Sequence, residues 1–249
     1  MFTQIVSLQY TPDQEEEAYD NLNLLIGLLR RNGQIIGKEY PIFKENAKLY
    51  TVVMTPENES LKDLYANKYV LAKKEVLGNS LTIQHLGHEV ELENSNCSCS
   101  TPSYYILHTN YLKLGSPLHC GDCFGEVPLY RLGNTEDYSS LLSWESNYVA
   151  CDTLQMNCTV GERFGLGQMS KVDSALSISG RAEARLLTQL IQKPVYYYLY
   201  NYRKISEKQD KARKCPSCHK DWYLDKQLHH LFDFKCDDCN LLSNLSTRS

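Results

Sequence analysis

Four cysteines near the end of the chain constrain its fold more than any other feature. The segments 215–218 and 236–239 each have the form Cys-x-x-Cys, with seventeen residues between them. This spacing is typical of a zinc site in which two tight turns each present two thiolates. Four thiolates complete the tetrahedral coordination of the ion and leave no position open for water or substrate. The sequence therefore predicts a structural zinc ion held by Cys215, Cys218, Cys236 and Cys239.

A second group of cysteines lies earlier in the chain. It combines a Cys-x-Cys pair with a Cys-x-x-Cys pair, twenty residues apart: Cys97, Cys99, Cys120 and Cys123. Gly121 suits the tight turn of the second pair, and we expect a second four-cysteine zinc site here. In one alternative, His108 or His119 replaces one thiolate. In another, Cys120 and Cys123 are a redox-active or simply buried pair without metal.

The cysteine content also bears on the compartment. The chain has ten cysteines, eight of them in close pairs, and its first residues resemble no signal peptide. Metal ligation in a reducing environment is therefore favoured over disulfides, and we expect a cytoplasmic protein. No apolar run approaches the roughly 18 residues that a membrane span needs, so we expect no membrane association.

Hydrophobic periodicity predicts an α+β fold. Within residues 1–94 the expected elements are a strand at 2–10, a helix at 15–31 ended by Asn32-Gly33, strands from 34 and at 49–54, a helix at 60–77 and a strand at 80–92. On the last strand the candidate inward positions are Leu81, Ile83, His85 and Val90. The order β-α-β-β-α-β is that of a ferredoxin-like domain.

The remaining chain falls into three segments. Residues 95–133 form the expected cysteine-rich zinc segment, 134–203 a helical region ending in a Tyr-rich strand, and 204–249 a zinc ribbon. Helices are predicted from Thr135 through Leu154 and from Asp173 to Lys193, and a strand at 195–203. Cys151 and Cys158 have no partner at ligand spacing, so we expect both to pack as buried apolar groups.

The glycine-rich segment 161–167 invites a phosphate-loop interpretation. It lacks the lysine of a Walker motif and the third glycine of a dinucleotide fingerprint, and no strand precedes it. A connector or a backbone turn is favoured instead. Within it, Arg163 is the first residue to test for a nucleotide-binding role.

The formal net charge of −4 argues against a nucleic-acid footprint over the whole surface. Basic residues nevertheless concentrate between 203 and 220, where seven Lys and Arg accompany only Glu207 and Asp210. The adjoining strand places alternate tyrosines on one face, where they would form a stacking platform for bases or pack against a helix. The candidate residues for binding nucleic acid or a partner are Arg203, Lys204, Lys211, Arg213, Lys214, Tyr196, Tyr198 and Tyr200.

The residues around these cysteines resemble a known family. Cys-Pro-Ser-Cys at 215–218, Trp222 and the run 231–244 are similar to a bacterial family described as zinc-ribbon-containing, with a suggested nucleic-acid-binding role. The segments 120–130, 163–165 and 194–199 also fit, so the resemblance covers nearly the whole chain. It implies a C-terminal zinc ribbon and nucleic acid as the ligand.

Two functions from different classes follow. The first is a non-enzymatic, zinc-stabilised protein that binds nucleic acid through the Tyr-rich, basic approach to the ribbon. The second is a protein-interaction module, such as an inhibitor or immunity-type partner, in which zinc is purely structural; Tyr is enriched at such interfaces. An enzyme is a further alternative: no Ser/His/Asp set, His-Glu-x-x-His motif or telling carboxylate pair indicates one, and the only candidates for an activated nucleophile are Cys120 and Cys123 in a metal-free form.

Overall fold

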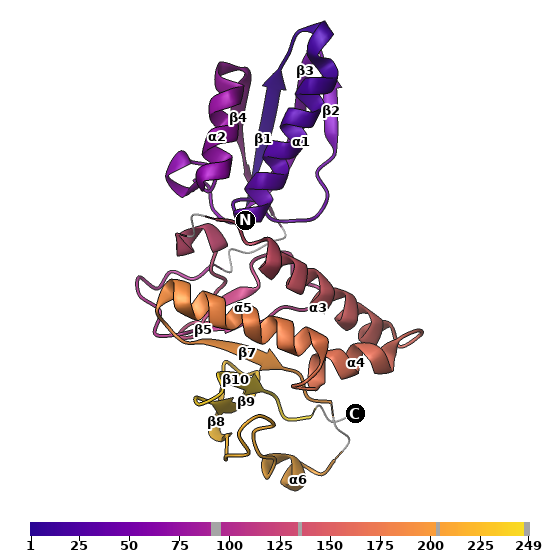
Figure 1. The fold of residues 1–249 in the computed structure, drawn as a ribbon, viewed down its shortest axis with the longest axis vertical. Helices are drawn as coiled ribbons and strands as arrows, with labels where there is room; N and C mark the ends of the chain where they lie inside the picture. The colour runs from indigo at the N-terminus through magenta and orange to yellow at the C-terminus, as the bar shows by residue number, and fades with distance from the viewer. Residues whose placement is uncertain (91–95, 134–135, 203–204, 247–249) are drawn as a thin grey trace. The chain divides into compact units, whose positions relative to one another are not determined.

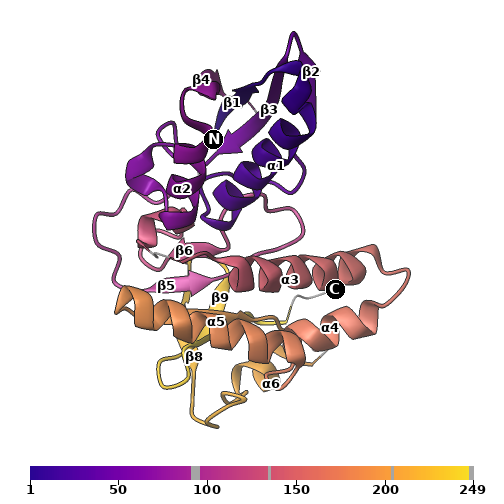
Figure 2. The same cartoon turned by 45° about the horizontal axis from the view of Figure 1, so that its top comes forward.

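The computed structural model describes residues 1–90, 96–133, 136–202 and 205–246. They divide into two compact units, drawn from two directions in Figures 1 and 2. Unit 1 takes in 1–96, 114–116 and 127–139, and unit 2 takes in 97–113, 117–126 and 140–249. Residues of the expected cysteine-rich segment 95–133 thus contribute to both units.

Unit 1 is built on one four-stranded sheet. Its strands are β1 (Phe2–Gln9), β2 (Ile42–Glu45), β3 (Lys48–Thr55) and β4 (Leu81–His88). They lie in the order β2-β3-β1-β4, and every neighbouring pair is antiparallel. The helices α1 (Glu15–Arg31) and α2 (Lys68–Leu77) pack on one face, as Figure 1 shows. In chain order these elements run β-α-β-β-α-β.

The helix expected at 15–31 is confirmed as α1. Five of its apolar residues recur at helical spacing and are buried in the core of unit 1: Ala18, Leu22, Leu25, Ile26 and Leu29. Acidic residues fill the first turn and two arginines the last, which complements the helix dipole. Gly33 follows with a φ of 74°, and a Cβ there would lie 2.6 Å from that of Leu129. The left-handed backbone at Gly33 ends the helix where the sequence predicts, and the close approach of Leu129 leaves room only for glycine.

Two expected elements of unit 1 begin elsewhere. The strand expected from residue 34 is reduced to a single bridge between Ile36 and Met54, because Gly37 has a φ of 108° and interrupts the extended chain. The helix expected at 60–77 begins only at Lys68. Ala66 is extended, and the side chain of Asn67 accepts a hydrogen bond from the backbone N–H of Val70, which caps the helix.

The last strand of unit 1 is shorter than expected. Leu81 and Ile83 pack on the core, whereas His85 and Val90 are exposed and the prediction for them is wrong. A shift of register opposite Thr3 and Gln4 disrupts the simple alternation of side chains along this strand. Residues 91 and 92 of the expected strand lie outside the described residues.

Unit 2 contains a six-stranded sheet that joins distant parts of the sequence. Its strands are β5 (Tyr105–Leu107), β6 (Leu118–Cys120), β7 (Val195–Leu199), β8 (Tyr223–Leu228), β9 (Phe232–Cys236) and β10 (Leu241–Ser243). The order is β6-β5-β7-β10-β9-β8, and β7 is parallel to both of its neighbours. The strands of the C-terminal cysteine segment therefore continue the sheet that holds Cys120.

The helices of unit 2 are α3 (Ser139–Asn157), α4 (Glu162–Ser170), α5 (Ala175–Ile191) and the short α6 (Glu207–Lys211). The ring of Tyr197 on β7 contacts Trp144 of α3 and leaves no room for a Cβ at Gly180 of α5. These contacts pack α3 and α5 against one face of the sheet. The helix expected from Thr135 begins at Ser139, whose N–H donates to the carboxylate of Asp137; Thr135 itself lies outside the described residues.

The glycine-rich segment 161–167 is neither a connector nor a loop, because most of it lies in α4. Gly161 precedes the helix with a φ of 71°. A Cβ at Gly165 would lie 2.3 Å from the backbone oxygen of Cys151, so this glycine permits close packing of α4 on α3. Arg163 is exposed on the first turn. The segment therefore forms a helix that packs on α3, and it does not form a phosphate-binding loop.

The described helices include none that is both long enough and apolar enough to cross a bilayer. Of the two remaining cysteines, Cys151 is buried as expected, but Cys158 is exposed and the prediction of a packed thiol is wrong there. Cys158 has a φ of 53° in the turn after α3, which turns it away from the core.

Candidate metal centres

The C-terminal cysteines form one compact group. Cys215 and Cys218 lie on a turn after α6, Cys236 ends β9, and Cys239 lies on the turn that leads to β10. All four sulfurs lie within 4.8 Å of one another, and the Cys218 and Cys236 sulfurs are 3.5 Å apart. The structure thus brings together the four ligands that the sequence predicts.

Backbone hydrogen bonds fix the first turn of this group. The N–H of Cys215 donates to the carbonyl of Lys220, and the N–H of His219 donates to the carbonyl of Cys215, both at 2.9 Å. The N–H of Lys220 also interacts with the Cys218 thiol and lowers its pKa to about 7. That pKa favours the thiolate form, which is the form that binds metal. Burial instead raises the pKa values of Cys215 and Cys236.

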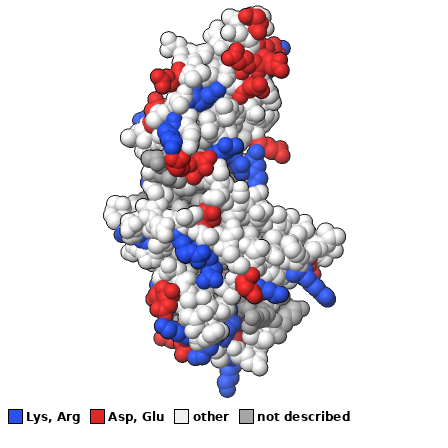
Figure 3. All heavy atoms as spheres, in the orientation of Figure 1, with Lys and Arg blue, Asp and Glu red and all other residues white. Residues whose placement is uncertain are grey.

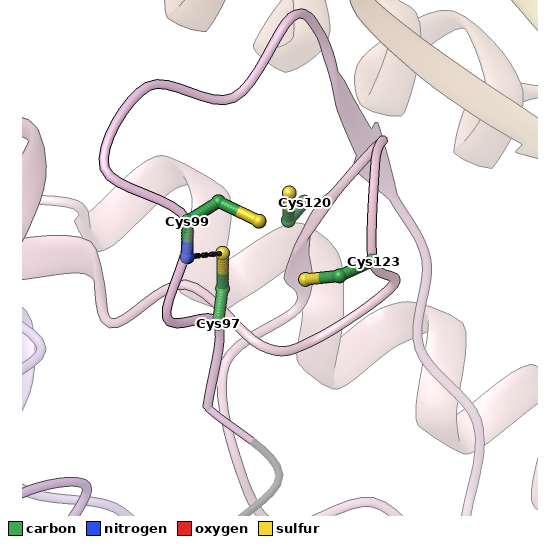
Figure 4. Close-up of side chains that lie close together, drawn as sticks. All are labelled: Cys97, Cys99, Cys120 and Cys123. Carbon is green, nitrogen blue, oxygen red and sulfur yellow. Dashed lines mark hydrogen bonds between the residues drawn. The ribbon is translucent and has the colours of Figure 1, made fainter.

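The second cysteine group has the same closed form. Figure 4 shows the side chains of Cys97, Cys99, Cys120 and Cys123 converging from a loop and from the turn that follows β6. Their sulfurs also lie within 4.8 Å of one another. The Cys-x-Cys pair manages this because the N–H of Cys99 donates to the Cys97 sulfur at 3.3 Å, which folds the two residues back on each other.

The turn at 120–123 depends on close packing. A Cβ at Gly121 would lie 2.3 Å from the Tyr104 ring, and the carboxylate of Asp122 accepts a hydrogen bond from the N–H of Ser103. Burial raises the pKa of Cys97. Burial also acts to raise the pKa of Cys123, but the N–H of Gly125 and the neighbouring thiols lower it by more.

All three Cys-x-x-Cys turns share one backbone feature. The residue after the second cysteine is left-handed in each case: Phe124 at 61°, His219 at 62° and Asn240 at 49°. Such a turn reverses the chain and directs both thiols and nearby N–H groups to one point. The three turns therefore present their thiols with the same backbone geometry.

The donor sets fit a zinc ion. A tetrahedral site with Zn–S bonds near 2.3 Å has sulfur–sulfur edges of about 3.8 Å, which is compatible with both groups. All ten cysteines are free thiols. Four thiolates around one ion leave no open coordination position, so the chemistry of each set is that of a structural site.

Neither His108 nor His119 belongs to a thiol group, so the alternative with a histidine ligand is not supported by the geometry. The two rings lie 5.5 Å apart in the core, and His119 contacts the ammonium group of Lys113, which is 3.4 Å from the Glu126 carboxylate. Burial lowers the pKa of His108 to about 3. No pattern in the sequence indicates this buried polar cluster, because it is assembled by strand pairing.

The proposed tyrosine platform is wrong for two of its members. Tyr196 and Tyr198 are 5% and 6% exposed and pack with Ile106, Phe232 and Leu242. The hydroxyl of Tyr196 donates to Asp237, and that of Tyr198 donates to Asn244. Packing, the alternative role of this strand, therefore describes these two tyrosines. Tyr200 lies beyond the end of β7 and is half-buried.

The basic run is largely neutralised within the structure. Lys211 pairs with Glu207, Lys214 with Asp221, and Lys220 with Asp238. Arg213 is buried against Asp210 and stacks on Trp222 and Phe234, so it is a structural residue and not a surface contact. Arg203 and Lys204 lie outside the described residues.

Charges of both signs alternate over the face of the molecule drawn in Figure 3. Among the residues described there, no continuous basic area covers the strands of the C-terminal cysteine segment. The acids that pair with Lys214 and Lys220 come from positions 221 and 238, beyond the basic run, and the fold brings them next to it.

Comparison with known proteins identifies relatives over nearly the full length. Residues 1–85, 99–200 and 204–249 match three families, each described as a domain of unknown function (DUF8589, DUF2310 and DUF8594). An uncharacterized protein of Haemophilus influenzae is 36% identical over 235 residues, which cover 90% of each chain. A second uncharacterized protein of that organism is 40% identical over 149 residues, covering 59% of this chain and 73% of its own. The chain therefore belongs to the family of uncharacterized bacterial proteins that these relatives represent.

Proposed function

We propose that this is a non-enzymatic zinc-binding protein in which two structural zinc ions hold the sheet of unit 2 together. The observation that carries the proposal is the pair of closed four-thiol groups. One group includes the end of β6, at one edge of the sheet, and the other includes the end of β9, next to the opposite edge. Ions at these positions would fix the connections that lead into and out of the sheet.

Two finer fold assignments accompany this proposal. The hairpin of β8 and β9 between the two C-terminal cysteine turns supports a zinc ribbon. The strand order β2-β3-β1-β4 with two helices on one face supports a ferredoxin-like unit 1. The ten free thiols support a reducing compartment, which we propose to be the cytoplasm.

Metal content tests the zinc proposal directly. The full chain is purified without chelator and analysed for bound elements. Two zinc ions per chain are expected. A chain that folds without metal, or that holds iron in place of zinc, would contradict the proposal.

We further propose that the ligand is single-stranded nucleic acid, bound where β7 ends beside the ribbon. Tyr202 is 39% exposed, and its ring lies nearly parallel to that of Tyr200, with centroids 6.4 Å apart. Lys211 and Lys214 are exposed nearby along the chain and could exchange their carboxylate partners for phosphates. Exposed aromatic rings beside cations suit stacked bases and their backbone.

Binding is tested by fluorescence anisotropy with a labelled single-stranded oligonucleotide at low salt. Because few cations are available, the salt dependence should be shallow, with a slope of about −1.4 for two phosphate contacts. Joint reversal of Lys211→Glu and Lys214→Glu should weaken binding about 10-fold or more, since two phosphate contacts are lost. Reversal at Arg203 and Lys204 should act in the same direction. The matched control, Lys226→Glu on β8, should change little, and absence of any binding at low salt would exclude this ligand.

The second candidate function is protein interaction, and one surface of unit 1 favours it. The sheet face opposite α1 and α2 presents Ile5, Phe43, Tyr50 and Val52, of which Phe43 and Val52 are 45% and 41% exposed. A sheet normally buries an apolar face against a second layer. At strand spacings of about 4.8 Å and rises of about 3.4 Å per residue, two such faces together bury roughly 1,000 Å², the lower limit for a specific interface.

A second copy of the chain is the partner that such a flat face fits, because two identical faces can pack about a two-fold axis. Light scattering of the purified protein should then give twice the mass of one chain, and Val52→Lys should return it to a single chain. A single-chain mass at all concentrations would exclude self-association. A stoichiometric foreign protein that copurifies and is lost in Val52→Lys would instead indicate an inhibitor or immunity-type role.

A further inference from the structure

A cavity of about 430 Å³ lies beside the C-terminal cysteine group. It is bounded by three separate segments of unit 2: the link between α4 and α5 at 170–173, the end of β7 at 199–202, and the turn at 213–216 with His219. A cavity of this volume falls in the range of roughly 300–1,000 Å³ that is usual for small-molecule sites. Of the residues that bound the cavity, the sequence predicts Tyr200, Arg213 and Lys214 as candidate binding residues and Cys215 as a zinc ligand.

The position of the cavity in the fold is typical of ligand sites. It lies where the chain leaves β7, and β7 is parallel to both β5 and β10. In open sheets with parallel strands, ligands bind outside the carboxyl ends of the strands. The floor is also rigid, because the N–H of Tyr200 donates to the carbonyl of Met169 and Asn201 is held by Asp210 and Asn244.

Among the charged residues that bound the cavity, cations outnumber acids. Lys171, Lys214 and His219 are exposed at the cavity, and Asp173 is the one acidic residue that bounds it. Lys214 shares its charge with Asp221, whereas Lys171 has no ion-pair partner among the residues that the structure describes. Two flexible ammonium groups and an imidazole suit a phosphate group, which accepts hydrogen bonds from several donors at once.

An aromatic wall completes the cavity. The rings of Tyr200 and Tyr202 both bound it and are inclined by only 17° to each other. A planar base can stack on such rings, and the Asp173 carboxylate can accept hydrogen bonds from an amino group or a sugar hydroxyl. Phosphate donors and a stacking surface within one cavity of this size match the dimensions and chemistry of a single nucleotide.

From this arrangement we propose that the cavity binds one phosphorylated nucleotide, with the phosphate at Lys171 and Lys214 and the base against Tyr202. The nucleotide is either free in solution or part of a single strand. The inference rests on the proposed nucleic-acid function and narrows it, because it assigns the recognition of one nucleotide to a defined site. The zinc group would hold the Cys215 side of the cavity in place.

Isothermal titration of the zinc-loaded full chain tests the proposal with three compounds: thymidine 5′-monophosphate, thymidine and inorganic phosphate. The monophosphate should bind more tightly than either part alone. Lys171→Glu should weaken its binding about 10-fold or more. Tyr202→Ala should weaken it about 5-fold or more, as loss of a base-stacking contact does, and Tyr202→Phe should restore it. The control Lys226→Glu, on β8 outside the cavity, should leave binding unchanged.

A labelled single-stranded oligonucleotide separates this inference from the broader function. If the oligonucleotide binds and both Lys171→Glu and Tyr202→Ala weaken it, the site belongs to strand binding. If the monophosphate binds in this way but the oligonucleotide does not, the cavity serves free nucleotides and the nucleic-acid function is wrong. If oligonucleotide binding is insensitive to both substitutions, or phosphate alone binds as tightly as the monophosphate, the inference is overturned.

Discussion

The guanidinium group of Arg213 is paired with the carboxylate of Asp210 inside unit 2, with Nε 3.1 Å from Oδ1. The two side chains are only 12% and 2% exposed. The same guanidinium donates to Ser243 and to the carbonyl of Asn244, and it stacks on Phe234. Arg213, which the sequence suggests is a surface cation, thus joins α6 to β10.

Arg213→Ala should destabilise the protein by about 3–5 kcal/mol, because it leaves the buried charge of the Asp210 carboxylate without its cationic partner. Urea denaturation of the zinc-loaded chain measures this. Lys211→Ala is the matched control: its pair with Glu207 is exposed and should contribute less than about 0.5 kcal/mol. A loss below about 1 kcal/mol for Arg213→Ala would show that the pair is not an essential contact.

Two glycines of α4 should respond oppositely to the same change. Gly165→Ala places a Cβ 2.3 Å from the Cys151 carbonyl and should destabilise unit 2 by about 1–3 kcal/mol. Gly167→Ala meets nothing within 4 Å and should stabilise the helix by up to about 1 kcal/mol. Thermal denaturation of both variants checks this. Equal effects at the two positions would contradict the close packing of α4 on α3.

The two thiol groups should bind metal independently. Cys120→Ser should reduce bound zinc from two ions per chain to one, because the C-terminal group shares no ligand with it. Cys215→Ser should remove the other ion. Cys158→Ser is the control, since this exposed thiol lies outside both groups and should keep both ions. Elemental analysis distinguishes these results, and loss of both ions from Cys120→Ser would mean that the sites are coupled.

Acid should destabilise the fold through His108. Burial lowers its pKa from the usual value near 6.5 to about 3, so the folded protein holds the ring neutral while the unfolded chain binds a proton. Its contribution to stability is therefore complete above pH 6.5 and is lost as pH falls from 6.5 toward 3. His108→Phe, in a site lined by Phe124, Tyr198 and Phe232, should remove this loss.

The difference between the two proteins appears as the slope of stability against pH. Between pH 6.5 and 5 the native chain should lose up to about 1.4 kcal/mol per pH unit more than His108→Phe. Both proteins keep the same thiol groups, so acid release of metal affects them alike. The exposed His230→Asn variant is the control and should follow the native slope. Parallel slopes for native protein and His108→Phe would contradict the prediction.

Local signals in the sequence determined the elements whose residues lie close together along the chain. The helix α1 follows from the spacing of Leu22, Leu25 and Leu29 and from the stop at Gly33. The pairing of thiols within each Cys-x-x-Cys turn follows from spacing, because such a turn brings its two thiols together whatever the rest of the chain does, whereas the joining of two pairs into a group of four depends on the fold. The β-α-β-β-α-β order of unit 1 was also predicted, but its second strand is β2 at Ile42–Glu45 and not the segment from residue 34, and the start of α2 depended on the cap at Asn67.

What the tertiary structure decided is which of these residues remain available for binding. Tyr196 and Tyr198 alternate along a strand in a way that fits a platform or a core, and only the pairing of β7 with β5 and β10 buries them. The basic residues of the run are close together in the sequence, but the carboxylates of Asp221 and Asp238, which pair with Lys214 and Lys220, lie outside the run. Burial and electrostatics depend on contacts between distant segments, which periodicity does not encode. For that reason the sequence identified the cysteines of the two four-thiol groups, whereas the cavity at Lys171 and Tyr202 emerged only from the fold.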